Sequence, residues 1–186
     1  MNKLRFPDVP FSECGDENEL RRSLKHRLKV TQDFIGHSIA DMKTLDIGQS
    51  NKLGRSLGIK HNTLDTDFNR SIDAPSGNYD LITCFEVLEH VMNPLFMMDR
   101  IYGLLKPGGV CYLTTPIRKR TDVFYGCRGH FTEYKPREMR LLFKYVGFKE
   151  MKYRKFLYWD WDFMFWGVRP FFRVLTQRHQ LWELRK

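Results

Sequence analysis

Short apolar strands that end on glycine or acidic residues alternate with helical segments along this chain of 186 residues. The predicted strands, each bounded by turn residues, are 44–47, 62–67, 79–85, 110–114 and 148–153. The predicted helices between them are 52–57, 94–105 and 136–146. This alternation predicts an α/β fold with a mostly parallel central sheet and flanking helices.

The length predicts a single domain over residues 1–186. Within it we expect an irregular arm (1–15), an N-terminal helix (16–36), a core (43–153) and a C-terminal segment (154–186). The four cysteines form no C-x-x-C pair, so neither a zinc knuckle nor a disulfide framework is expected. No signal peptide and no apolar stretch of roughly 20 residues is found, and we therefore expect a cytoplasmic protein.

The positive charge of the chain is concentrated in its last third. Residues 1–116 hold 14 basic and 15 acidic residues, whereas residues 117–186 hold 17 and 7. Nine of the 17 residues in 156–172 are also aromatic. Three interpretations are open: a final β-hairpin or helix that packs on the sheet with the aromatics as core, a peripheral membrane contact at headgroup depth, or a stacking surface for single-stranded RNA.

Polar residues and glycines follow three of the predicted strands, at Asp46–Gly48, Asp65–Asp67 and Phe85–Glu86. Ligands of parallel α/β sheets bind beyond the carboxyl ends of the strands, so this clustering predicts a nucleotide-type cofactor pocket. Gly48 permits a close approach of a ligand to the backbone, and Asp65 is placed to accept hydrogen bonds from ribose hydroxyls. The G-x-G-x-x-G and P-loop patterns are absent, which argues against a dehydrogenase or a P-loop enzyme.

Four motifs occur in order: Leu45-Asp-Ile-Gly48, Tyr79-Asp-Leu-Ile82, Phe85-Glu-Val-Leu-Glu-His-Val-Met-Asn-Pro94 and Leu104-Leu-Lys-Pro-Gly-Gly109. Together they resemble the motifs of class I S-adenosylmethionine (SAM)-dependent methyltransferases, in the branch with E-V-L-E-H after the fourth strand. The resemblance implies a Rossmann-like class I methyltransferase fold and SAM as the cofactor. It places Asp46 and Gly48, with the adjacent Gln49, on the methionine side, Asp65 at the ribose and Phe85 near the adenine.

The sequence departs from the family pattern at two places. Ser50 stands where the family usually has a further glycine, and only about a dozen residues separate the second strand from Tyr79. The family usually has a helix and another strand in that interval, so either Asp65 or Asp67 is the ribose carboxylate. A non-catalytic, methyltransferase-like binding module that acts through its basic C-terminal face is therefore the alternative to an enzyme.

Glu86, Glu89 and His90 share one face if their segment is helical, because they are spaced at i, i+3 and i+4. With His130 they form a ligand set for Mg²⁺ or Mn²⁺. The set looks like that of ubiquinone-pathway O-methyltransferases and small-RNA 3′-end methyltransferases, which implies that the metal binds substrate hydroxyls. Two alternatives stay open: the residues only cap and orient the helix and hydrogen-bond within the site, or His90 or His130 is a general base without metal.

These motifs predict SAM-dependent methylation of an oxygen on a small-molecule, sugar or lipid-linked acceptor. The competing hypotheses are the non-catalytic module and an RNA 2′-O-methyltransferase. RNA binding whose affinity falls as the salt concentration rises would distinguish an RNA 2′-O-methyltransferase from an enzyme that methylates a small-molecule, sugar or lipid-linked acceptor.

Overall fold

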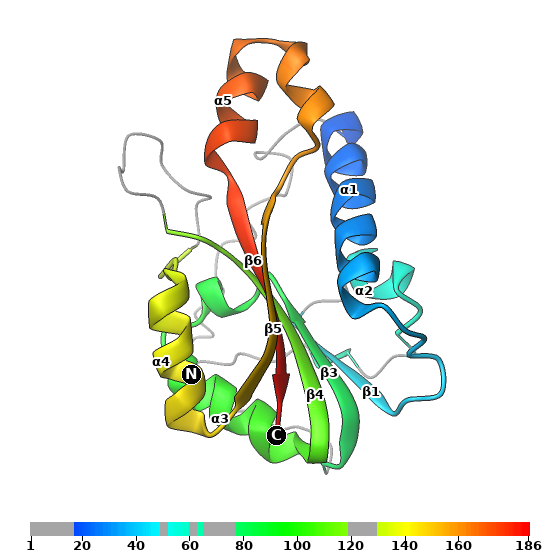
Figure 1. The fold of residues 1–186 in the computed structure, drawn as a ribbon, viewed down its shortest axis with the longest axis vertical. Helices are drawn as coiled ribbons and strands as arrows, with labels where there is room; N and C mark the ends of the chain where they lie inside the picture. Colours follow the sequence, from blue (N-terminus) through cyan, green and yellow to red (C-terminus); the bar gives the residue numbers. More distant parts are fainter. Residues whose placement is uncertain (1–16, 49–51, 60–62, 65–76, 119–129) are drawn as a thin grey trace, which may run out of the picture.

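A six-stranded sheet forms the centre of the protein in a computed structural model that describes residues 17–48, 52–59, 63–64, 77–118 and 130–186. The strand order is β2-β1-β3-β4-β6-β5 (Figure 1). The strands are β1 (Thr44–Ile47), β2 (Thr63–Leu64), β3 (Tyr79–Phe85), β4 (Leu105–Pro116), β5 (Lys149–Leu157) and β6 (Arg178–Arg185). The predicted arm 1–15, Gln49, Asp65 and Asp67 lie outside the described residues.

The strands β2, β1, β3 and β4 are parallel, and β6 is antiparallel to both of its neighbours, β4 and β5. The predicted α/β fold with a mostly parallel sheet is therefore confirmed. A final β-hairpin was one interpretation of the C-terminal segment, but the position of β6 and its place between β4 and β5 were not predicted. Its side chains Leu181, Trp182 and Leu184 are fully buried, so the C-terminal residues complete the middle of the sheet.

Helices cover both faces of the sheet. These are α1 (Glu17–Ile35) and α2 (Lys52–Ser56) on one face and α3 (Pro94–Leu104) and α4 (Pro136–Val146) on the other. The described chain also contains α5 (Val168–Thr176) and the 3₁₀ turns η2 (Leu88–His90) and η3 (Trp161–Trp166). The predicted helix ends are confirmed at two places. Asn93 caps α3 by accepting a hydrogen bond from the Phe96 amide, and Gly147 ends α4 with a φ of 103°.

Two hydrophobic cores result, one on each face of the sheet. On one face, α3 and α4 bury Met98, Ile101 and Phe143 against strand residues that include Trp182. On the other face, α1 and α2 bury Phe34 and Leu53 against Leu81, Phe85 and Tyr112. Helices therefore pack on both faces of the parallel strands. This packing holds the carboxyl ends of the strands in place at one edge of the sheet.

Several segments meet at the carboxyl edge of the parallel strands. The Gly48 turn follows β1, the 86–93 loop follows β3, and Pro116 at the end of β4 pairs with His179 at the start of β6. Residues 158–177, which we call the aromatic cap, connect β5 to β6 and project beyond the same edge (Figure 1). No helix in the described ranges is long and apolar enough to cross a membrane.

Candidate active site

The turn after β1 is held by a buried carboxylate and a close backbone contact. Asp46 is buried, and its Oδ1 accepts a hydrogen bond of 2.6 Å from the Thr83 hydroxyl. Gly48 has a φ of +107°, and a Cβ at this position would lie 2.7 Å from Cγ2 of Val87. The turn after β1 and the loop after β3 are therefore in contact at Gly48. Glycine permits both the positive φ and the close approach of Val87.

The remaining residues expected around the cofactor are placed only in part. Phe85 is buried in the core formed with α1 and α2, which leaves little of its ring surface for an adenine base. Gln49, Asp65 and Asp67 lie outside the described residues. Of the residues expected around the cofactor, the structure therefore places Asp46, Gly48 and Phe85.

Glu86 does not share a face with Glu89 and His90, because the segment is not the continuous helix that the i, i+3, i+4 reading assumed. Glu86 has a φ of 58° and only Leu88–His90 forms a 3₁₀ turn. The Glu86 carboxylate instead lies 2.9 Å from Nδ1 of His179. Burial opposes ionisation, but the charge and hydrogen bond of His179, and the charge of Arg27, lower the pKa of Glu86 to about 2.

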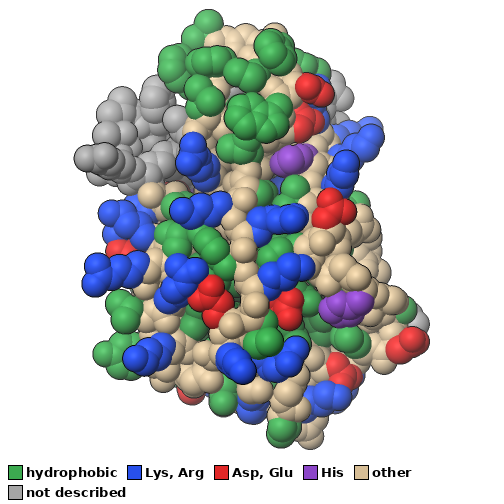
Figure 2. Space-filling view, in the orientation of Figure 1, with side chains coloured by type: hydrophobic (Ala, Val, Ile, Leu, Met, Phe, Trp, Pro, Cys, Tyr) green, Lys and Arg blue, Asp and Glu red, His purple; other side chains and the backbone are tan. Residues whose placement is uncertain are grey.

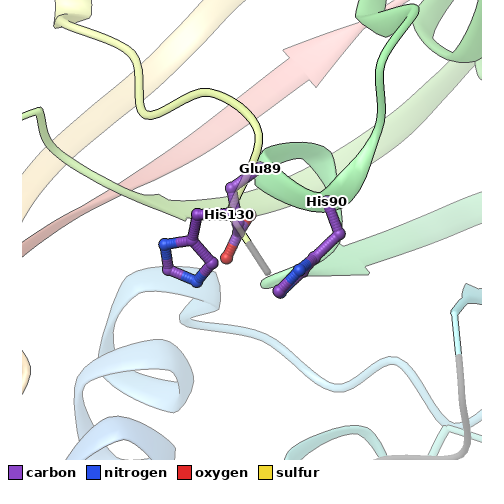
Figure 3. A group of neighbouring side chains, drawn as sticks. All are labelled: Glu89, His90 and His130. Carbon is purple, nitrogen blue, oxygen red and sulfur yellow. The ribbon is translucent and has the colours of Figure 1, made fainter. Parts of the chain in front are cut away.

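Glu89, His90 and His130 converge, and one potential ligand atom from each lies within 4.8 Å of the others (Figure 3). The imidazole rings of His90 and His130 are 4.8 Å apart and nearly perpendicular. The loop that carries His130 is tied to the 3₁₀ turn, because the Glu89 carbonyl accepts a 2.8 Å hydrogen bond from the Phe131 amide. Residues about 40 positions apart in the sequence are thereby brought to one point at the carboxyl edge.

Glu89 is fully buried, and its two oxygens differ in their surroundings. Oε2 accepts a 3.1 Å hydrogen bond from the Thr115 hydroxyl, whereas Oε1 has no hydrogen-bond partner within the described part of the chain. Burial, with a smaller contribution from the charge of Glu86, raises the pKa of Glu89 well above its usual value. A buried carboxylate oxygen without a partner is costly unless a cation or a proton occupies the site.

His130 is oriented by a neighbouring carboxylate. Its Nδ1 lies 3.0 Å from Oε1 of Glu133. This hydrogen bond favours the tautomer with the proton on Nδ1, which leaves Nε2 as an acceptor or ligand. One carboxylate and two imidazoles, with a carboxylate behind one imidazole, fit a divalent metal ion of the Mn²⁺ or Zn²⁺ type, and Mg²⁺ with added water ligands.

The sequence profile of the family described as "Methyltransferase domain" matches residues 14–153. The chain belongs to this family of class I SAM-dependent methyltransferases. Solved structures agree on the fold. A SAM-dependent methyltransferase from Archaeoglobus fulgidus has a TM-score of 0.64 at 14% identity and covers 95% of this chain and 100% of its own. A methyltransferase described as putative, from Bacillus halodurans, has a TM-score of 0.59 at 17% identity, with 87% and 99% coverage.

Curated relatives match part of this chain. The ubiquinone biosynthesis O-methyltransferase of Psychrobacter cryohalolentis is 37% identical over 107 residues, which are 54% of this chain and 42% of that protein. The enzyme of the same name from Shewanella pealeana is 32% identical over 87 residues, 47% of this chain and 36% of that protein. The matched region spans less than half of the length of each relative.

Several residues of the site were not identified from the sequence. His179 and Thr83 each hold a candidate residue in place, and no motif marks them. Thr115 and Glu133 hold Glu89 and His130, a role that was not predicted for them. His179 comes from β6, nearly 100 residues after its partner Glu86, so only the antiparallel pairing of β4 with β6 brings the two together. Arg118, which follows β4, forms an ion pair with Glu138.

Proposed function

We propose that this protein transfers the methyl group of SAM to an oxygen atom of a small-molecule acceptor. The observation that carries the proposal is the convergence of Glu89, His90 and His130 at the carboxyl edge. Val87, in the same loop as Glu89 and His90, contacts Gly48 in the turn after β1. The family match supports SAM as the cofactor, and the names of the curated relatives support oxygen as the accepting atom.

A divalent metal ion held by Glu89, His90 and His130 is part of the proposal. Such an ion lowers the pKa of a bound hydroxyl and fixes its oxygen for in-line attack. The protein prepares this site in two ways: Thr115 holds one oxygen of Glu89, and Glu133 holds Nδ1 of His130. Without a metal, Nε2 of His130 or the exposed imidazole of His90 is the group available to accept the proton of the acceptor hydroxyl.

The buried cluster favours an enzyme over a non-catalytic module. A protein that only binds through its C-terminal face gains nothing from a fully buried Glu89 carboxylate with an unpartnered oxygen, since that group reduces the stability of the fold. Polar groups retained at such a cost are typical of functional sites.

Asp46→Asn tests the cofactor side of the proposal. The asparagine oxygen can still accept the hydrogen bond from Thr83, so the fold is expected to persist while the negative charge is lost. We expect the affinity for S-adenosylhomocysteine, measured by calorimetry, to fall about tenfold or more, as hydrogen bonds to charged groups contribute ~1.5–3 kcal/mol.

The matched control is Asp99→Asn, which removes the same charge from an exposed position on α3. Its affinity for S-adenosylhomocysteine should equal that of the wild type. Equal affinity in Asp46→Asn would show that the cofactor lies elsewhere. An absence of binding in the wild-type protein would favour the non-catalytic module.

A further inference from the structure

The aromatic cap turns most of its large apolar side chains outward. Exposed fractions are 81% for Phe165, 60% for Trp161, 57% for Trp166 and 76% for Val168. On α5, Phe171, Phe172 and Leu175 are also exposed. Trp159, Phe163 and Val174 form a small inner core of the cap, and Tyr158 and Met164 pack against it. An apolar surface of this kind at one end of a protein marks an interaction site.

The cap forms a projecting end of the molecule. Figure 2 shows its hydrophobic side chains gathered at that end, with lysine and arginine side chains spread over the strands next to it. It connects β5 to β6, whose first paired residues are Leu157 and Arg178. A projecting apolar end can enter a soft, deformable phase without the matching concave surface that a protein partner must supply.

The charges around the cap complement an anionic surface. Arg154, Lys155 and Arg178 are exposed where β5 and β6 join the cap. Two carboxylates of the cap lie close to a basic residue of α1. Arg22 pairs with Asp160 at 2.8 Å and lies 3.6 Å from Asp162. The apolar end is therefore bordered by basic groups, and the acidic groups nearby are partly neutralised.

We propose that the aromatic cap is a docking surface for a lipid bilayer that contains anionic lipids. Tryptophan and phenylalanine side chains bind at headgroup depth, and neighbouring lysine and arginine side chains contact lipid phosphates. The nine residues of α5 are too few to span a bilayer, so the cap lies in the interface. A second copy of the chain fits less well, because a symmetric contact between two caps would bring the basic residues of both copies together.

Docking through the cap orients the molecule. The cap and the cluster of Glu89, His90 and His130 are both at the carboxyl edge of the sheet, so docking turns that edge toward the membrane. Resting on the proposed function, this orientation would give the site access to an acceptor that is anchored in the bilayer. The docking itself does not depend on methyl transfer and is tested without it.

The test is co-sedimentation of the full chain with vesicles of phosphatidylcholine containing about 30% phosphatidylglycerol, compared with phosphatidylcholine alone. We expect binding to the anionic vesicles, with a blue shift of tryptophan emission because Trp161 and Trp166 are exposed in the free protein. Phe165→Ser with Val168→Ser should lower the partition coefficient about tenfold or more. Lys155→Gln with Arg178→Gln should lower it by about the same factor.

Two controls match these variants. Tyr145→Ser removes an aromatic side chain that is also 81% exposed, but on α4. Lys149→Gln with Arg185→Gln removes two charges from the other end of the same strand pair, more than a Debye length of about 8 Å away. Both controls should bind as the wild type does.

Three outcomes would overturn the proposal. One is no binding of the wild type to anionic vesicles. Another is equal weakening by the cap variants and their controls, which would indicate unspecific charge attraction. The third is a wild-type dimer that Phe165→Ser with Val168→Ser converts to a monomer without any vesicle binding, which would assign the cap to contact between copies of this chain.

Discussion

Glu89→Gln is expected to abolish metal-dependent methyl transfer while the protein still binds S-adenosylhomocysteine. Glutamine keeps the size of the side chain and can accept the hydrogen bond from Thr115, but it cannot supply an anionic oxygen to a divalent ion. Loss of groups that merely support metal ligands costs about 10–100-fold, so loss of a ligand should cost at least about 100-fold in kcat/KM. The measurement is methyl transfer with Mg²⁺ or Mn²⁺, against EDTA.

Glu133→Gln is the graded counterpart of this variant. It leaves all three candidate ligands in place and weakens only the orientation of His130, so a loss of about 10–100-fold in metal affinity is expected. A wild-type enzyme that is indifferent to EDTA would refute the metal site. Activity of Glu89→Gln at the wild-type level would refute any role of this carboxylate in the reaction.

Glu89→Gln also has an expected effect on stability, which separates loss of function from loss of fold. Burial raises the pKa of the Glu89 carboxyl well above its usual value of 4.5, so between the usual and the raised pKa the folded state holds a proton that the unfolded state releases. Metal-free wild-type protein should therefore lose stability as the pH rises above about 4.5, relative to the variant. Melting temperatures of wild type and variant in EDTA, measured at several pH values, check this. The melting temperature of the variant minus that of the wild type should rise from pH 5 to pH 8, and a fall in this difference would contradict the prediction.

The sequence predicts the parts of this fold whose signals are local. The helices α3 and α4 begin at prolines and have one apolar face each, and Gly147 marks the end of α4, as found. The strands β1 and β3 are short apolar runs next to turn residues. Each of these features depends on neighbours within a few positions, so a single sequence is sufficient to identify them.

The features that were missed depend on contacts between distant residues. The strand β6 lies in the sheet because it pairs with both β4 and β5. No pattern within Arg178–Arg185 indicates which strands are its partners. The side chain of Glu86 turns to His179 because of one backbone angle with positive φ, which no spacing rule anticipates for a glutamate. Glu86, Glu89 and His90 were grouped by helical spacing, and His130 was added to that set. In the structure Glu89, His90 and His130 lie close together, whereas Glu86 turns away from them.

Gly48→Ala is expected to destabilise the protein and to weaken cofactor binding together. The added Cβ would lie 2.7 Å from Cγ2 of Val87, and the φ of +107° is strained for any residue with a side chain. Backbone strain of this kind costs of order 1–3 kcal/mol. Relief of the contact would move Val87, the residue that joins the β1 turn to the loop carrying Glu89 and His90. The measurements are denaturant unfolding and calorimetry with S-adenosylhomocysteine.

Gly103→Ala is the matched control, and a double variant separates the two causes. Gly103 lies within α3 with nothing within 4 Å of an added Cβ, so alanine there should stabilise the helix by up to about 1 kcal/mol. Combining Gly48→Ala with Val87→Ala removes the methyl contact but leaves the backbone angle, so the two changes together should cost less than the sum of their separate effects. Full additivity would mean that the contact with Val87 is unimportant and that strain alone requires glycine. Wild-type stability and affinity in Gly48→Ala would exclude both causes, and with them the placement of the cofactor at this turn.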